Sequence, residues 1–299
     1  MWDSYAFGNY RLFCRELRDI LDYAGADKVL FGTDNPIFNT VMPTKEYIQL
    51  IKDLPANSPE GIEFTKEEVD GILGGNAAKV EVLKYSQIIA KEGYVIGSGG
   101  NVSVLIEGEE ALAITPSSID YFNLTENDIC IVGFDSKPVE GEHRPSIETG
   151  FHIAVYKNRL DVNAIIHTHQ TFASVFTVLN RPIPALFDEQ VLHLGNIIDV
   201  IPYGVSGSPD LVQNVVSKLD NDCNCYLLQN HGALCLGLDL AQALRNVKLL
   251  EKTAKVYYYA LNLEKELTTI PKPYEDVFFG LLKNEQQKEI ERKKDIKTK

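Results

Sequence analysis

The chain has 299 residues, 44% of them hydrophobic, and a formal net charge of −13. These values are typical of a globular protein with one large domain or two ordinary ones. The acidic balance argues against a nucleic-acid-binding surface, which needs a basic stripe. The sequence has no apolar run of the ~18 residues that span a membrane. Its five cysteines are scattered and odd in number. We therefore expect a cytoplasmic protein in a reducing compartment.

Residues 1–78 differ in character from the rest of the chain. Their pattern predicts helices over residues 10–25, 45–54 and 66–80 and a short strand over 28–34. Thr65 and Glu68 have the spacing of a capping box at the start of the third helix. We expect three parts: 1–78, a domain over 79–270, and a charged helical tail over 271–299, where basic and acidic residues are interleaved.

The second part mixes predicted strands and helices, which indicates an α/β fold. Strands are expected over residues 101–106, 111–115, 128–134, 164–169, 196–203 and 225–237, the last as one long apolar strand. Helices are expected over residues 81–93, 147–158, 171–180, 208–219 and 239–262.

Three histidines suggest a metal site. His167 and His169 project from the same face of a strand, because side chains alternate along it. His231 also follows an apolar run, next to Gly232. Three neutral imidazoles with one open position are typical of catalytic zinc. Taken alone, the His-x-His pattern fits a hydrogen-bonded strand end equally well.

Glu148 is a candidate for proton transfer. It follows the loop residues Pro145 and Ser146 and lies in the first turn of a predicted helix. A carboxylate there often only complements the helix dipole. Because it stands shortly before the histidine strand, helix and strand could pack together and place it beside the ion.

Three Gly- or Ser-rich loops offer donors to a small anion. The stretch "GYVIGSGGNVSV" fails the dinucleotide fingerprint, because Val102 stands in place of the last glycine and a strand follows. Its exposed backbone N–H groups and Asn101 would still suit an anion. Ser117 and Ser118 follow a proline, and Ser146 could contribute another hydroxyl. Each loop alone is more often a plain turn.

Together, "GSGGNVSV", "ITPSSI", "PSIETGFHIAVY", "IIHTHQ" and "QNHGA" resemble the class II aldolase/adducin family, in the family's order. The resemblance implies a three-layer α/β/α domain with a central, mainly antiparallel sheet, usually assembled as a homotetramer. It implies that His167, His169 and His231 hold Zn²⁺ or another divalent metal, and that Glu148 moves the proton. It also implies that the loops containing Gly100, Asn101, Ser117, Ser118 and Ser146 bind the phosphate of a small substrate.

Departures from the family pattern leave the reaction open. Ile147 replaces a second serine before the glutamate of some phosphate-binding members. Asp188 lies where the aldolases place a tyrosine and where the epimerases use a catalytic aspartate. The leading expectation is a zinc-dependent aldolase acting on a phosphorylated or carboxylated hydroxy-ketone. Alternatives on the same metal core are a pentulose-phosphate 4-epimerase, a methylthioribulose-phosphate dehydratase or a decarboxylase. An adducin-like interaction module would lack the metal histidines.

A second resemblance concerns residues 1–78. "AGADKVLFGTDNP" and "ILGGNAAKV" resemble the last strand and closing helix of a TIM-barrel amidohydrolase, whose metal-ligand or base aspartate matches Asp34. A whole barrel needs about 250 residues, and this block contains no histidine. We expect a truncated α/β segment without hydrolase activity of its own.

Overall fold

The protein is described here by a computed structural model, which describes residues 8–30, 44–263 and 265–298. Its contacts divide the chain into two compact units, Met1–Val80 and Glu81–Lys299. Each unit is considered by itself. Within the described residues, no helix combines the length and the apolar character needed to cross a membrane.

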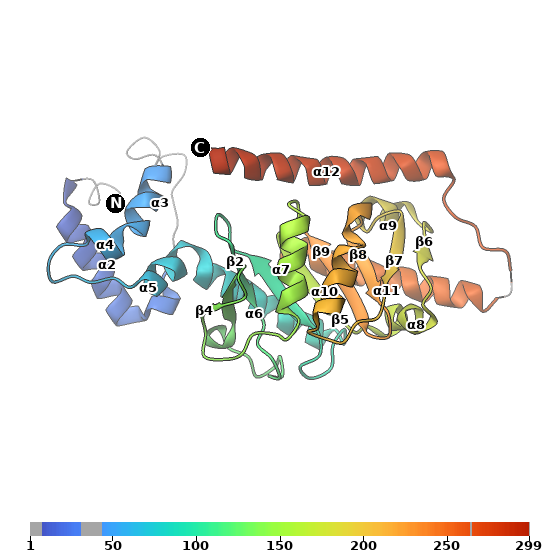
Figure 1. Cartoon of the computed structure of the whole chain (residues 1–299), viewed down its shortest axis with the longest axis horizontal. Coiled ribbons are helices and arrows are strands. Elements are labelled where there is room, and N and C mark those ends of the chain that lie inside the picture. The colour runs from blue at the N-terminus through green and yellow to red at the C-terminus, as the bar shows by residue number, and fades with distance from the viewer. Residues whose placement is uncertain (1–7, 31–43, 264, 299) are drawn as a thin grey trace. The chain divides into compact units, whose positions relative to one another are not determined.

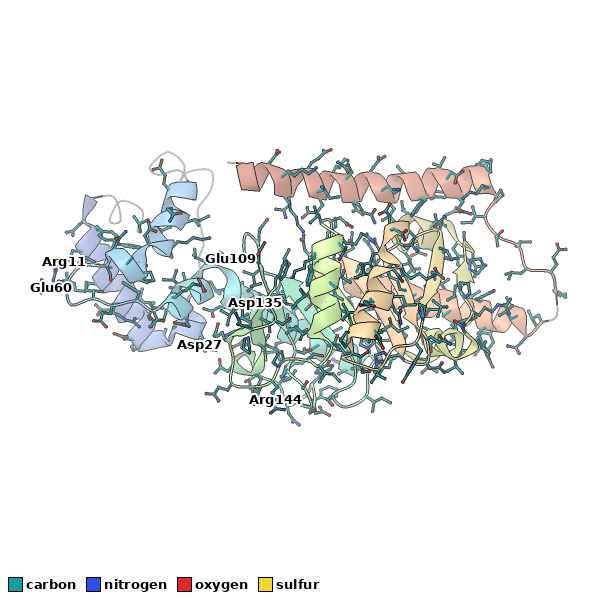
Figure 2. All side chains as sticks on the ribbon, in the orientation of Figure 1. Arg11, Asp27, Glu60, Glu109, Asp135 and Arg144 are labelled. Atoms are coloured by element: carbon teal, nitrogen blue, oxygen red, sulfur yellow. The ribbon has the colours of Figure 1, made fainter. Side chains whose placement is uncertain are left out.

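The described part of the first unit is helical. Its elements are α2 (Tyr10–Ala24), η1 (Ala26–Lys28), α3 (Thr44–Lys52), α4 (Leu54–Asn57), α5 (Lys66–Asp70) and η3 (Gly71–Gly75). Phe13, Leu17 and Leu21 lie on one face of α2 and pack into a small core. Arg11, on the same helix, donates to the Glu60 carbonyl (Figure 2). Asp34 and most of the predicted strand lie outside the described residues, so the amidohydrolase resemblance stays a prediction.

The helix predicted over 66–80 is divided in two. Thr65 and Glu68 form the predicted capping box, with reciprocal hydrogen bonds of 2.9 and 3.1 Å. The backbone at Gly74 is not helical (φ 165°, ψ −22°), and the turn around it is a π-helix. Helix α6 (Asn76–Lys91) then begins anew and also covers the helix predicted over 81–93. The glycines in this stretch interrupt the helix. Because the apolar residues keep a helical spacing across the break, the sequence pattern did not reveal it.

A nine-stranded sheet forms the centre of the second unit, in the order β4-β3-β2-β1-β5-β9-β8-β7-β6. Only β7 and β8 pair in parallel. The strands are β1 (Asn101–Leu105), β2 (Ala111–Ile114), β3 (Cys130–Gly133), β4 (Pro138–Glu140), β5 (Ala164–Thr168), β6 (Ile183–Pro184), β7 (Ile197–Ile201), β8 (Cys225–Leu228) and β9 (Gly232–Gly237). The single strand predicted over 225–237 is wrong. It is a hairpin that turns at Asn230, whose φ is 54°.

Helices cover both faces of this sheet, which confirms the predicted three-layer architecture. Helices α7 (Thr149–Asn158) and α10 (Pro209–Val216) lie in front of the strands in Figure 1, and α11 (Leu240–Leu261) lies behind them. The front layer packs on alternate strand residues such as Ile165 and Leu234. On the other side, α11 packs against β5, β9 and α8 (Thr171–Leu179). Apolar residues on both faces explain why β5 is a continuous buried run.

The segment predicted as a charged tail forms α12 (Lys272–Thr298), which packs on the rest of the second unit. It contacts α9 (Asp188–His193). Leu282 is 1% exposed. Gln286 donates to the Asp222 carbonyl at 2.9 Å and to Asn224 Oδ1 at 3.0 Å. Short 3₁₀ turns, η4 (Glu126–Asp128) and η5 (Leu219–Asn221), complete the unit. Helix α12 therefore contributes a narrow buried face, while most of its residues are exposed.

We predict that Leu282→Ala lowers the free energy of unfolding by about 2–4 kcal/mol, because it leaves a cavity under α12. Leu281, its exposed neighbour, provides a matched control, since Leu281→Ala should change stability by less than about 0.5 kcal/mol. Urea denaturation followed by circular dichroism measures both. Equal effects of the two substitutions would show that α12 does not pack as described.

Candidate metal and proton-transfer site

The three histidines converge at the ends of neighbouring strands. His167 lies on β5, which pairs with β1 on one side and β9 on the other. His169 follows the end of β5, and His231 lies in the hairpin just before β9. The ligand nitrogens of all three lie within 4.8 Å of one another. The strand pairing therefore brings together residues that are 64 positions apart in the chain.

The rings are held so that nitrogen lone pairs face inward. His167 Nδ1 lies 2.9 Å from the Ala233 carbonyl and donates to it, which leaves Nε2 without a proton in the neutral ring. His169 Nε2 lies 3.0 Å from His167 Nε2. Burial lowers the pKa of His167 well below its ordinary value, and the neighbouring histidines lower it further. Burial, followed by the effect of His231, also lowers the pKa of His169. His167 and His169 therefore favour the neutral imidazole, the form that binds metal.

Glu148 completes the site. It is the N-cap residue of α7 and is 5% exposed. Its Oε1 lies 3.2 Å from His231 Nε2, and its Oε2 lies 3.4 Å from His167 Nε2. Glu148 Oε1 and His231 Nδ1 are buried without a hydrogen-bond partner among the described atoms. Unpartnered buried acceptors are costly. Three imidazoles and a carboxylate offering lone pairs to one point are a donor set that fits a divalent cation.

The structure brings the predicted anion loops next to this cluster. Ser117 donates its N–H to the Arg144 carbonyl and its hydroxyl to the Pro145 carbonyl, both at 2.9 Å. The Ser146 N–H donates to the Thr115 carbonyl. These bonds join residues 115–118 to 144–146, at the edge of the second unit where Arg144 lies (Figure 2). Ser118 adopts a positive φ of 63°. Their role in binding phosphate stays a prediction.

Two glycines allow the backbones to approach the histidines. A Cβ on Gly100, whose φ is +72°, would lie 2.5 Å from the His167 carbonyl oxygen. A Cβ on Gly232 would overlap the Thr168 carbonyl and lie 2.5 Å from His169 Cδ2 and 3.0 Å from His167 Cε1. A residue larger than glycine at either position would displace β5, the strand that carries His167. This gives a physical reason for the glycine after His231.

Asp188 is placed elsewhere. It is the first residue of α9 and is exposed, beyond β6 at the edge of the sheet. Among the described contacts, none joins Asp188 to the three histidines. Its catalytic role stays a prediction that would require a neighbouring subunit.

Sequence reasoning missed a buried polar group behind Glu148. His152 and Tyr156 follow Glu148 at helical spacing on α7, and Ser103 follows Asn101 at strand spacing on β1. Both spacings were readable in the sequence. What the sequence did not show is that these two faces meet.

Gly232→Ala should reduce metal affinity by about 10-fold or more, because the added methyl group displaces His169 or Thr168. Titration with a competing chelator measures this effect. Gly280→Ala is the matched control, since a Cβ there meets nothing within 4 Å. Unchanged affinity in Gly232→Ala would contradict the described close packing.

Acid should destabilise the metal-free protein through His152. Burial lowers the pKa of His152 from 6.5 to about 3. The unfolded chain therefore binds a proton that the folded chain does not, and stability falls as pH drops below about 6.5, by up to ~1.4 kcal/mol per unit. Denaturation curves at several pH values compare the wild type with His152→Leu. The variant should show the shallower slope, and equal slopes would contradict the assignment.

Comparison with known proteins gives the family. The model of the class II aldolase and adducin N-terminal domain matches residues 80–258. An L-fuculose phosphate aldolase of Methanocaldococcus jannaschii is 35% identical over 187 residues, covering 62% of this chain and 99% of the relative. A 5-deoxy-D-ribulose 1-phosphate aldolase of Bacillus thuringiensis is 27% identical over 202 residues, covering 65% and 94%.

A solved L-fuculose 1-phosphate aldolase superimposes with a TM-score of 0.66 at 33% sequence identity, covering 69% of this chain and 96% of the other. The region that the family model matches thus contains the sheet, its two helical layers and the strand-end histidines. Because this region spans more than half of the chain, the protein belongs to the class II aldolase and adducin family.

Proposed function

We propose that this protein is a zinc-dependent lyase that breaks or forms a C–C bond in a small phosphorylated hydroxy-ketone. The observation that carries the proposal is the convergence of three imidazoles and Glu148 on one point. The names of the relatives support a sugar phosphate as the substrate.

His167, His169 and His231 would hold the ion, and three imidazoles favour zinc among divalent metals. When bound, the ion supplies a Lewis acid for the negative charge that develops on a substrate oxygen during C–C cleavage. Glu148 then takes or gives the proton through Oε1, which no other described group occupies. The loops that contain Gly100, Asn101, Ser117, Ser118 and Ser146 would orient the phosphate, so its binding energy positions the reacting end.

The family's homotetramer is part of the proposal. Phe172, Tyr258 and Tyr259 form an aromatic cluster on α8 and α11, with ring centroids 5.5–5.9 Å apart. Val178 and Leu179 on α8 are 66% and 58% exposed. Such an apolar surface suits burial between copies of the chain, and light scattering would measure the assembly. Cytoplasmic location is also proposed, supported by five free cysteines, all of them buried.

An epimerase on the same core is the second candidate, supported by Asp188 in place of the aldolases' tyrosine. Fuculose, rhamnulose, ribulose and methylthioribulose phosphates separate these reactions, because cleavage releases an aldehyde and epimerisation does not. An adducin-like module would bind no metal and turn over none of them.

The purified protein should contain about one zinc per chain and lose turnover with chelator. His167→Ala should lose the metal. His143→Ala is the matched control, because His143 lies outside the cluster and pairs with Asp128 at 2.8 Å. Glu148→Gln should keep the metal but lower kcat by about 10²- to 10⁴-fold. Metal analysis and aldehyde release measure these effects. A protein without metal, or full turnover in Glu148→Gln, would refute the proposal.

A further inference from the structure

A column of buried polar side chains runs behind Glu148. Glu148, His152 and Tyr156 lie at positions i, i+4 and i+8 of α7 and its cap, on one face of the helix. Asn101 and Ser103 lie at i and i+2 of β1, on one face of the strand. The helical and strand repeats are similar in length, so the two sets interleave. All five residues are at most 5% exposed.

The column is joined by hydrogen bonds from end to end. Tyr156 OH lies 2.7 Å from Ser103 Oγ, which lies 2.7 Å from His152 Nδ1. His152 Nε2 lies 2.5 Å from Asn101 Oδ1. Asn101 Nδ2 then lies 2.8 Å from Glu148 Oε2 and 3.1 Å from Ser146 Oγ. Apart from Glu148 Oε1, which has no partner among the described atoms, the polar side-chain atoms of the column are hydrogen-bonded, and such a buried network fixes the positions of its members.

The direction of every bond follows from the carboxylate. An ionised carboxylate only accepts, so Asn101 must turn its NH₂ group toward Glu148 and its oxygen toward His152. His152 must therefore donate from Nε2. Because burial lowers its pKa to about 3, the ring is neutral and carries one proton, which leaves Nδ1 as an acceptor. Ser103 donates to Nδ1 and accepts from Tyr156. All donors thus point toward Glu148.

We propose that His152 is a positioning residue, which acts through Asn101 to hold Glu148 with Oε2 hydrogen-bonded and Oε1 free toward the histidine cluster. If the imidazole proton moved to Nδ1, Nε2 would become an acceptor and the Asn101 amide would turn over. Asn101 would then present its oxygen to the carboxylate, and the two would repel each other.

The same network uses both amide hydrogens of Asn101, on Ser146 and on Glu148. The Asn101 side chain therefore links the proton-transfer carboxylate to the Ser146 hydroxyl, which adds a positioning role to the predicted anion-binding loop that contains it.

The first test needs no substrate. Nitrogen-15 NMR of the metal-free protein, labelled at histidine, distinguishes the two tautomers and the protonated ring. We expect His152 to remain the neutral Nε2–H tautomer from about pH 5 to 8, because its pKa is far below the ordinary value. A protonated ring or the Nδ1–H tautomer would overturn the proposal. Because this measurement does not depend on turnover, it stands even if the proposed lyase function fails.

The second test rests on the proposed function and compares two substitutions. His152→Gln keeps an N–H donor near the Nε2 position, and His152→Leu removes it. His152→Leu should lower kcat by about 10- to 100-fold with KM nearly unchanged, as for other residues that orient site groups, and His152→Gln should recover most of the loss. Zinc content and thermal unfolding of both variants verify that they fold and load metal.

Tyr226→Phe is the matched control, since Tyr226 is buried and donates to Asn221 Oδ1 at 2.7 Å, away from the site. It should change stability but not kcat. Equal losses of kcat in the Leu and Gln variants, or unchanged kcat in His152→Leu, would show that His152 only packs. If the wild-type protein showed no turnover, the lyase proposal would be refuted, and the tautomer result would be unaffected.

Discussion

The pairing of β5 between β1 and β9 is the constraint on which the site depends. In this register, His167 lies opposite Asn101 on one side and Leu234 on the other. The His167 ring packs against the Phe151 ring of α7, with the ring centroids 5.8 Å apart. A shift of one residue in either strand pair would turn His167 to the opposite face of the sheet, away from Phe151. The apolar residues on both faces of β5 hold this register, so the core of the domain and the geometry of the site share one cause.

Once these strands pair, electrostatics shapes the site. Three imidazoles and a carboxylate are gathered where water is largely excluded, and burial holds His167 and His169 in the neutral form. In such an environment lone pairs are left facing one another, which is unfavourable without a cation between them. The pairing and packing of the sheet offset the free-energy cost of bringing these groups together. A divalent cation bound at this point, as we propose, would relieve that repulsion.

The surroundings of Glu148 show how a fold can orient a buried carboxylate from behind. Glu148 caps α7, and Asn101 begins β1. The polar column lies between this helix and this strand. Its hydrogen bonds leave no polar atom of His152 free for water or metal. Buried polar networks of this kind contribute less to stability than to a unique arrangement of the groups they support. Here the supported group is the carboxylate beside the histidine cluster.

The sequence by itself determined the mixed α/β class and the identity of the metal candidates, because His-x-His on a strand, a glycine after His231 and Ser-rich loops are local patterns with local physical meaning. The three-layer domain followed from the resemblance of the motifs to the class II aldolase/adducin family. The sequence did not determine that residues 225–237 turn back on themselves, because an apolar run looks the same in one strand as in a hairpin. Nor did it show that His152 and Ser103 meet, although each spacing was visible. Only the tertiary structure decided which helix face packs on which strand face, since that depends on the register of pairings between distant segments.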